Sequence, residues 1–244
     1  MKKEWFGEWF NSPYYHILYK NRDNAEARKF IDNLTAHLKI TTEHQLMDLA
    51  CGKGRHAIYL NKQGFDVTGL DLSDENIKHA RQFANDKLHF EVHDMRLPFE
   101  HQKFDFIFNL FTSFGYFETT HEHEVAIKSV ARALKPKGKL ILDFFNTYKV
   151  INDLKPHEIK KVDGIEFNIE KQLSDAGYII KDIHFTYEGE QYHFTEKVKA
   201  IKRIDFLEFF KKAELKVVNV FGDYDLSPYT AEQSERMIFI VEKI

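Results

Sequence analysis

Short apolar runs alternate with helix-length segments over roughly the first 146 residues, and this alternation limits the fold more than any other feature. The segments 54–62 and 75–85 each have about the length that a right-handed crossover between parallel strands requires. The expected strands are 45–50, 66–72, 88–93, 104–111 and 139–145. Parallel strands joined by helices in this way are typical of a doubly wound α/β sheet.

The segment before the fifth expected strand has the pattern of an amphipathic helix. Its apolar residues recur at helical spacing, at Ile127, Val130, Ala131 and Leu134. Pro136 and Gly138 predict that this helix ends before the next strand begins at Lys139.

The pattern changes after residue 150. Three strand-like runs follow, at 165–173, 178–187 and 191–200, and short polar turns join them. Such runs predict antiparallel hairpins. A helix containing Phe206, Phe209 and Phe210 then precedes two closing strands, at 216–221 and 237–242.

These patterns predict one α/β core with an insertion. The core is expected at 41–149 and 201–244, and an antiparallel β lobe at 150–200. Residues 1–40 are expected to form an aromatic, helical lid. The aromatic side chains near the start of the chain are Trp5, Phe6, Trp9, Phe10, Tyr14, Tyr15 and Tyr19. A lid that excludes water and contacts a ligand through its rings is one interpretation, and a helix docked on the core is the other.

Composition narrows the class of partner. The chain has a net charge of -3, so no general attraction for nucleic acid or anionic lipid is expected, and a small-molecule substrate is favoured. Cys51 is the only cysteine, which excludes an internal disulfide, and no metal site is predicted. No apolar run suits a signal peptide or a membrane span, so a cytoplasmic location is expected.

A glycine-rich turn, Asp48-Leu49-Ala50-Cys51-Gly52-Lys53-Gly54, follows the first expected strand. Glycines allow the backbone to approach a ligand, and the N-terminus of the following helix offers free N–H groups. With Ala57, the two glycines also satisfy the spacing of a dinucleotide-binding turn. The turn alone therefore leaves two candidate cofactors, NAD and S-adenosylmethionine (SAM).

Acidic residues at three strand ends favour SAM. Asp48 would repel a pyrophosphate, whereas SAM carries sulfonium and ammonium cations. Asp71 could accept hydrogen bonds from ribose hydroxyls, and Asp94 from the adenine amino group. Asp71 could instead only cap a helix, and Asp94 only shape a turn. Leu72 and Met95 are expected either to flank the adenine ring or to pack in the core.

Four segments resemble the successive motifs of class I SAM-dependent methyltransferases. They are the glycine-rich turn, Gly69-Leu70-Asp71-Leu72-Ser73, His93-Asp94-Met95 and Leu134-Lys135-Pro136-Lys137-Gly138-Lys139. The resemblance implies a seven-stranded Rossmann-like sheet with an antiparallel last strand and the hairpins inserted before the last two strands. The cofactor-binding residues that it implies are Asp48, Ala50, Gly52, Gly54, Asp71, Leu72, Asp94, Met95 and Asn109.

The segment from Asn109 to Tyr116 is similar to the fourth-strand segment of small-molecule N-methyltransferases, including those that act on amino sugars. The aromatic N-terminus and the late hairpins resemble that group too. This resemblance implies an amine acceptor. The candidate acceptor-contacting residues are Tyr14, Tyr15, Ser113 and Tyr116. A homodimer formed through the inserted lobe is a further expectation.

No catalytic residue is assigned from the sequence. Methyl transfer from SAM is an in-line displacement in which positioning supplies much of the acceleration, although a hydroxyl acceptor would need a base. Cys51 is interpreted as a small buried residue, and His56 as packing or capping more often than acting as a base. The alternative functions are an NAD-dependent oxidoreductase and a non-catalytic SAM-binding module.

Overall fold

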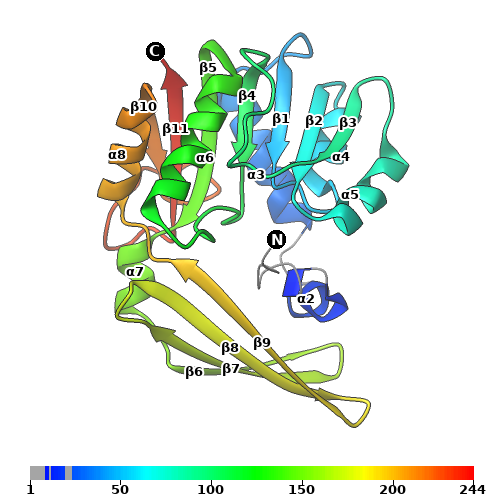
Figure 1. Cartoon of the computed structure of the whole chain (residues 1–244), viewed down its shortest axis with the longest axis vertical. Coiled ribbons are helices and arrows are strands. Elements are labelled where there is room, and N and C mark those ends of the chain that lie inside the picture. The colour runs from blue at the N-terminus through cyan, green and yellow to red at the C-terminus, as the bar shows by residue number, and fades with distance from the viewer. Residues whose placement is uncertain (1–8, 11, 20–23) are drawn as a thin grey trace.

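The computed structural model describes residues 9–10, 12–19 and 24–244, which form two sheets with helices around the larger one (Figure 1). The larger sheet contains β1 (Gln45–Leu49), β2 (Asp66–Asp71), β3 (Leu88–Val92), β4 (Phe104–Asn109), β5 (Leu134–Phe145), β10 (Leu215–Phe221) and β11 (Arg236–Lys243). The smaller sheet contains β6 (His157–Val162), β7 (Ile165–Leu173), β8 (Tyr178–Tyr187) and β9 (Glu190–Lys199). The helices are α2 (Pro13–Leu18), α3 (Asn24–His37), α4 (Arg55–Lys62), α5 (Asp74–Ala80), η1 (Arg81–Phe83), α6 (Thr120–Ala133), α7 (Thr147–Asn152) and α8 (Arg203–Lys212).

The strand order of the larger sheet is β10-β11-β5-β4-β1-β2-β3. Neighbours among β1 to β5 pair in parallel, whereas β11 pairs antiparallel with both β5 and β10. The chain reverses its direction along the sheet after β3, and the crevice at such a reversal is where open α/β sheets bind ligands. The predicted doubly wound sheet with an antiparallel last strand is confirmed.

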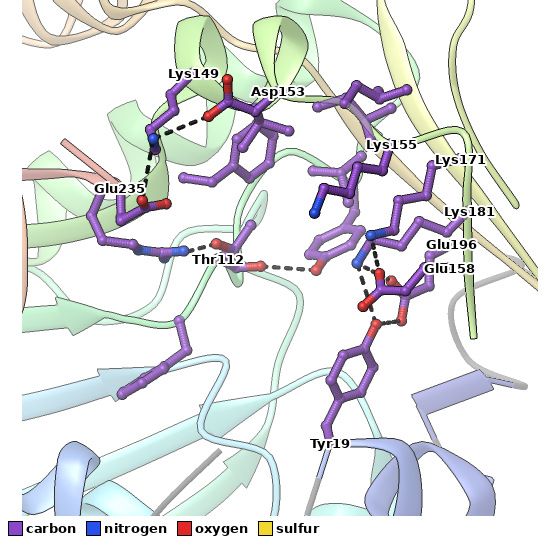
Figure 2. Close-up of a pocket in the computed structure, with 18 of the residues that line it drawn as sticks. Tyr19, Thr112, Lys149, Asp153, Lys155, Glu158, Lys171, Lys181, Glu196 and Glu235 are labelled. Atoms are coloured by element: carbon purple, nitrogen blue, oxygen red, sulfur yellow. Dashed lines mark hydrogen bonds and ion pairs between the residues drawn. The ribbon is translucent and has the colours of Figure 1, made fainter. Parts of the chain in front are cut away.

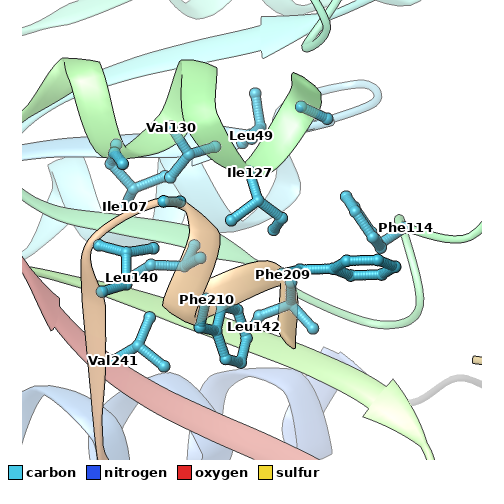
Figure 3. Close-up of a cluster of buried hydrophobic side chains, with 14 of the residues drawn as sticks. Leu49, Ile107, Phe114, Ile127, Val130, Leu140, Leu142, Phe209, Phe210 and Val241 are labelled. Atoms are coloured by element: carbon cyan, nitrogen blue, oxygen red, sulfur yellow. The ribbon is translucent and has the colours of Figure 1, made fainter. Parts of the chain in front are cut away.

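Helices cover both faces of the larger sheet. Helices α6 and α8 pack on one face, where Ile127, Val130, Phe209 and Phe210 meet Leu140 and Leu142 of β5 (Figure 3). Helices α3, α4 and α5 contribute to the apolar cluster on the other face. Each fully buried Leu, Ile or Phe stabilises the fold by roughly 1.5–3 kcal/mol, so these two layers hold the strand ends in fixed positions.

Strand β5 begins earlier than predicted, at Leu134. The helix ends at Ala133, and Leu134 already pairs with Phe104. The register then shifts before Lys139 pairs with Phe106, and Pro136 lies in this irregular stretch. A proline can be accommodated there because an irregular pairing does not require every backbone N–H. The expectation that the strand starts at Lys139 was wrong for this reason.

The smaller sheet has the order β6-β7-β8-β9, with antiparallel neighbours. The three predicted strands are present, and β6 is a fourth that the sequence did not reveal. Its residues, His-Glu-Ile-Lys-Lys-Val, include few apolar side chains because β6 is an edge strand. Charged residues on an exposed edge prevent pairing with other chains.

The N-terminal segment packs on this smaller sheet. Trp9 and Leu18 share an apolar cluster with Ile165, Phe167 and Ile183. Helix α3, by contrast, belongs to a cluster of the larger sheet. Trp5 and Phe6 of the predicted lid lie outside the described residues. Within the described chain, every helix is too short or too polar to cross a bilayer.

Candidate active site

The two glycines of the turn have the backbone that the sequence predicts, and Ala50 adopts the same left-handed conformation although it is not a glycine. Ala50, Gly52 and Gly54 have φ values of 62°, 56° and 83°, in the left-handed region. A Cβ at Gly54 would lie 2.8 Å from the ring of Phe90, so only glycine fits there. The N–H of Gly52 donates to Oδ2 of Asp71 at 2.8 Å. This bond fixes the turn to the end of the neighbouring strand.

A cavity of about 380 Å³, here called the cofactor cavity, opens beside this turn. Ligand sites usually measure about 300–1,000 Å³. Six of the predicted cofactor-binding residues line it: Ala50, Gly52, Asp71, Leu72, Asp94 and Met95. The structure thus brings three separate sequence motifs to one cavity. The contacts of these residues with a cofactor stay predictions.

Asp48, Gly54 and Asn109 do not line the cofactor cavity. The buried Asp48 carboxylate accepts a hydrogen bond from the N–H of Ala57 at 3.1 Å, and burial raises its pKa to about 7. Asn109 donates from Nδ2 to the carbonyl oxygen of Leu49 at 3.0 Å. Both side chains therefore stabilise the backbone around the turn without lining the cavity.

The sequence left open whether Asp71 caps a helix or contacts a ligand, and the structure gives the capping role to Ser73. Ser73 is the residue that caps α5, because its Oγ accepts from the N–H of Asn76 at 3.1 Å. Asp71 accepts from the N–H groups of Ser73 and Gly52 and lines the cavity. Burial raises the pKa of its carboxyl group. Asp71 thus remains available for a ligand at the cavity wall.

Asp94 lies in a charged pair at the end of β3. Its carboxylate accepts from the guanidinium of Arg96 at 2.6 Å, and Arg96 also binds Glu122 at 2.8 Å. Burial by itself would raise the pKa of Asp94, but the hydrogen bonds and charge of Arg96 outweigh it, so the pKa is lowered. Asp94 is therefore an ionised acceptor at neutral pH.

Cys51 and His56 have the passive roles expected of them. Cys51 is buried, and burial raises the pKa of its thiol, so the thiolate is not available as a nucleophile. The His56 ring stacks on Phe111 with 5.0 Å between ring centroids, and burial lowers its pKa to about 3. His56 does not line the cofactor cavity.

A second cavity of about 510 Å³, here called the lobe cavity, lies between the two sheets (Figure 2). Residues from α7, all four lobe strands and the start of β11 line it. Five residues line both cavities: Phe10, Tyr15, Phe111, Thr112 and Tyr116. We call these five residues the shared wall.

The shared wall contains two strained residues. Phe111 and Thr112 have φ values of 57° and 61°, which is unusual for residues other than glycine and especially for a β-branched one. The buried Asp143 carboxylate accepts from the N–H of Phe111 at 2.7 Å. Arg236 donates to Asp143 at 2.8 Å and to Oγ1 of Thr112 at 2.9 Å. Strain persists only where surrounding contacts enforce it, and these contacts do so.

The four candidate acceptor-contacting residues separate into three groups. Tyr15 and Tyr116 lie in the shared wall, and Ser113 lines only the cofactor cavity. Tyr14 lines neither of these cavities, because its ring packs on Phe185 and Tyr192 of the lobe. The contacts of these residues with an acceptor stay predictions.

Comparison with known proteins identifies the family. The family described as "Methyltransferase domain" matches residues 47–142, which include the glycine-rich turn. The "Putative methyltransferase YqeM" of Bacillus subtilis is 30% identical over 210 residues, covering 82% of this chain and 84% of the relative. The chain belongs to the methyltransferase family. SAM is the cofactor of this family, as the three acidic strand ends predicted.

Two further similarities bear on this methyltransferase. A dTDP-3-amino-3,4,6-trideoxy-alpha-D-glucopyranose N,N-dimethyltransferase of Streptomyces venezuelae is 33% identical over 132 residues, covering 53% of this chain and 54% of the relative. The crystal structure of a SAM-dependent methyltransferase from Clostridium acetobutylicum superposes with a TM-score of 0.80 at 21% identity, covering 94% and 96% of the two chains. The second similarity confirms the fold over 94% of this chain.

Sequence reasoning missed Asp143, Arg236 and the charged residues of the lobe cavity. Asp143 and Arg236 are 93 positions apart and meet only because β5 and β11 pair. The signal of this pair in the sequence was one aspartate, Asp143, inside the otherwise apolar run from Leu140 to Phe145. In the described part of the methyltransferase, no cluster of three or more His, Cys, Asp or Glu side chains could hold a metal ion.

Proposed function

We propose that this methyltransferase transfers the methyl group of SAM, bound in the cofactor cavity, to an amine of a small molecule bound in the lobe cavity. The observation that carries this proposal is the composition of the shared wall. Among the described residues that line both cavities, all five are aromatic or threonine, and none carries a carboxylate, imidazole, amine or thiol.

The chemistry of the two acceptor classes gives this composition its meaning. A hydroxyl acceptor needs a base within hydrogen-bond reach, because a neutral alcohol is a weak nucleophile. A neutral amine attacks with its own lone pair. The S–CH₃ bond breaks as the N–CH₃ bond forms, the sulfonium becomes a thioether, and the product ammonium loses its extra proton to solvent. A wall without a basic side chain therefore suits an amine.

The residues of the two cavities would divide the work of positioning. Asp71 would accept hydrogen bonds from the ribose hydroxyls, and Leu72 and Met95 would contact the adenine ring. The rings of Tyr15 and Tyr116 would face the cationic sulfonium and the positive charge that grows on the amine. SAM carries an activated leaving group, so holding the nucleophile in line supplies much of the acceleration.

The Streptomyces relative gives independent support, because its name describes methylation of an amino group on a sugar. The matched region covers only about half of each chain, 53% and 54%. The sugar and the nucleotide in that name are properties of the relative. Only the amine chemistry enters our proposal.

The test compares acceptors that differ in one group. Amines and their matched alcohols are incubated with the protein and SAM, and release of S-adenosylhomocysteine is measured. Turnover of amines alone is expected. Turnover of the alcohols alone would contradict the amine acceptor while preserving methyl transfer. Binding of SAM without turnover of any amine, alcohol or carboxylate would favour the non-catalytic module.

The pH profile provides a second readout. Because no basic side chain lines the shared wall, kcat/KM should rise with pH until the acceptor amine itself is deprotonated. Two amine acceptors whose pKa values differ by about two units should therefore give profiles displaced by about two pH units. Identical profiles for both amines would show that an enzyme group controls the proton, and the proposal would be withdrawn.

A further inference from the structure

Three lysines point into the lobe cavity from the lobe side. Lys171 and Lys181 extend from neighbouring strands β7 and β8, and Lys155 extends from the segment that joins α7 to β6. Figure 2 shows their side chains directed toward the same region of the cavity. This concentration of positive charge is not explained by the methyl transfer itself.

The register of the lobe strands places two of these lysines directly opposite each other. Lys171 pairs with Lys181 across β7 and β8, and Lys181 pairs with Glu196 across β8 and β9. Like charges in directly opposed positions destabilise a sheet. Their repulsion is a cost that this wall of the cavity must offset.

Two glutamates offset part of that cost. Lys171 forms an ion pair with Glu158, and Lys181 forms one with Glu196 at 3.1 Å. Glu196 is also bound by Nε1 of Trp9 at 2.7 Å and by the hydroxyl of Tyr19 at 2.6 Å. The carboxylate of Glu196 is therefore already shared among three donors.

Lys155 is the lysine that has no such counterion. Among the described residues, none of the carboxylates forms an ion pair with it. Glu158 is three positions further along the chain and lines the same cavity, but it pairs with Lys160 and Lys171. The lobe side of the cavity thus carries Lys155, Lys171 and Lys181 against two glutamates. The other carboxylates that line the cavity, Asp153 and Glu235, pair with Lys149, so among the described residues the ammonium group of Lys155 is the one of these three without an ion pair.

The geometry points to an anionic group on the acceptor, a carboxylate or a phosphate, held by Lys155, Lys171 and Lys181 while its amine faces the shared wall. This inference rests on the proposed function and narrows it to amines that carry a negative charge. Charge-assisted bonds from ammonium groups suit both kinds of anion. An anion here would also relieve the repulsion between Lys171 and Lys181.

Calorimetry with anions tests this inference without requiring turnover. Inorganic phosphate, pyrophosphate and succinate are titrated into the protein saturated with S-adenosylhomocysteine. At least one anion should bind, and Lys155→Gln should weaken it about tenfold, the effect of one charge-assisted bond. Lys155→Glu should abolish binding. Pyrophosphate binding without succinate binding would indicate a phosphate on the acceptor, and the reverse a carboxylate.

Lys161→Gln is the matched control. Lys161 lies on the same sheet, is exposed, pairs with Glu166 and does not line the lobe cavity. Its variant should bind the anion as the unmodified protein does. Equal binding by Lys155→Gln and the unmodified protein, or no binding of any of the three anions, would overturn the inference.

The two proposals fail separately. Methyl transfer to uncharged amines together with no anion binding would leave the amine proposal standing and remove the anionic group. Anion binding that depends on Lys155, with methyl transfer only to alcohols, would remove the amine and keep the anion site. When an acidic amine is turned over, Lys155→Gln should raise its KM about tenfold and leave the KM of its uncharged amide unchanged.

Discussion

The cofactor cavity and the lobe cavity share a wall but are built in different ways. Apart from the shared wall and the residues next to it at 113–117, the cofactor cavity is formed by short segments at the carboxyl ends of β1, β2 and β3. The lobe cavity is formed by side chains from elements that are distant in sequence and converge only in the folded chain. The first can be found by motif, and the second only by knowing which strands pair.

Arg236→Ala should have the largest effect, because it tests the wall that the two cavities share. It leaves the buried Asp143 carboxylate without its guanidinium partner, and breaking a buried pair costs about 3–5 kcal/mol. Denaturant unfolding measures that loss. Both SAM affinity and acceptor turnover should fall in the protein that remains folded, because Thr112 loses its contact.

Lys149→Ala is the control for Arg236→Ala. Lys149 lines the lobe cavity and pairs with Asp153 and Glu235, which are largely exposed. Loss of such surface pairs should cost less than about 1 kcal/mol. If Arg236→Ala lowers acceptor turnover but leaves SAM affinity intact, the wall does not couple the cavities.

Asp48→Asn should stabilise the core beneath the cofactor cavity. Burial raises the pKa of Asp48 from 3.8 to about 7, so the native state favours the protonated form. The protonated carboxyl group therefore contributes stability that is fully present below about pH 4 and is lost as the pH rises through 7. The total loss is up to about 4 kcal/mol. Asparagine is neutral throughout and can still accept from Ala57.

The measurement is the free energy of unfolding at several pH values. Asp48→Asn should be more stable than the unmodified protein above pH 7 and similar to it near pH 4. The exposed Asp86, changed to asparagine, is the control for the substitution itself and should change the free energy of unfolding by less than about 0.5 kcal/mol. A constant difference between Asp48→Asn and the unmodified protein at all pH values would contradict the expected linkage.

Asp71→Ala should weaken SAM binding about 10-fold to 100-fold, the effect of losing one or two hydrogen bonds to a charged acceptor. It also removes the acceptor for the N–H of Gly52. Calorimetry with S-adenosylhomocysteine measures the change. Asp153→Asn, which removes a carboxylate from the lobe cavity instead, should leave this affinity unchanged. Unaltered affinity in folded Asp71→Ala would exclude Asp71 from cofactor binding.

Tyr116→Phe should have the smallest effect, and it tests whether the Tyr116 hydroxyl contacts the acceptor at the wall between the two cavities. It keeps the ring in the shared wall and removes the bond from its hydroxyl to the carbonyl oxygen of Thr112, which measures 2.8 Å. A neutral bond of this kind contributes about 0.5–1.5 kcal/mol. We expect kcat/KM to fall about threefold to tenfold. A larger loss would mean that the hydroxyl contacts the acceptor directly.

The sequence predicted the larger sheet and the cofactor cavity well because both depend on local patterns. Gly52 and Gly54 follow β1, Asp71 ends β2, and parallel strands must bring their ends to one edge. It failed at β6, whose edge position removes the apolar alternation that marks a strand. It also failed at the opposed Lys171 and Lys181, since their meeting is set by register between two strands and not by any spacing within one.

The burial of Cys51 has a practical consequence for all of these measurements. The chain contains no other cysteine, and this thiol is covered and held in its neutral form. A cysteine introduced elsewhere on the surface is therefore the single site that a thiol-reactive fluorophore modifies. Placed at an exposed lobe position such as Lys161, one fluorophore would report directly whether the lobe changes its position when cofactor and acceptor bind.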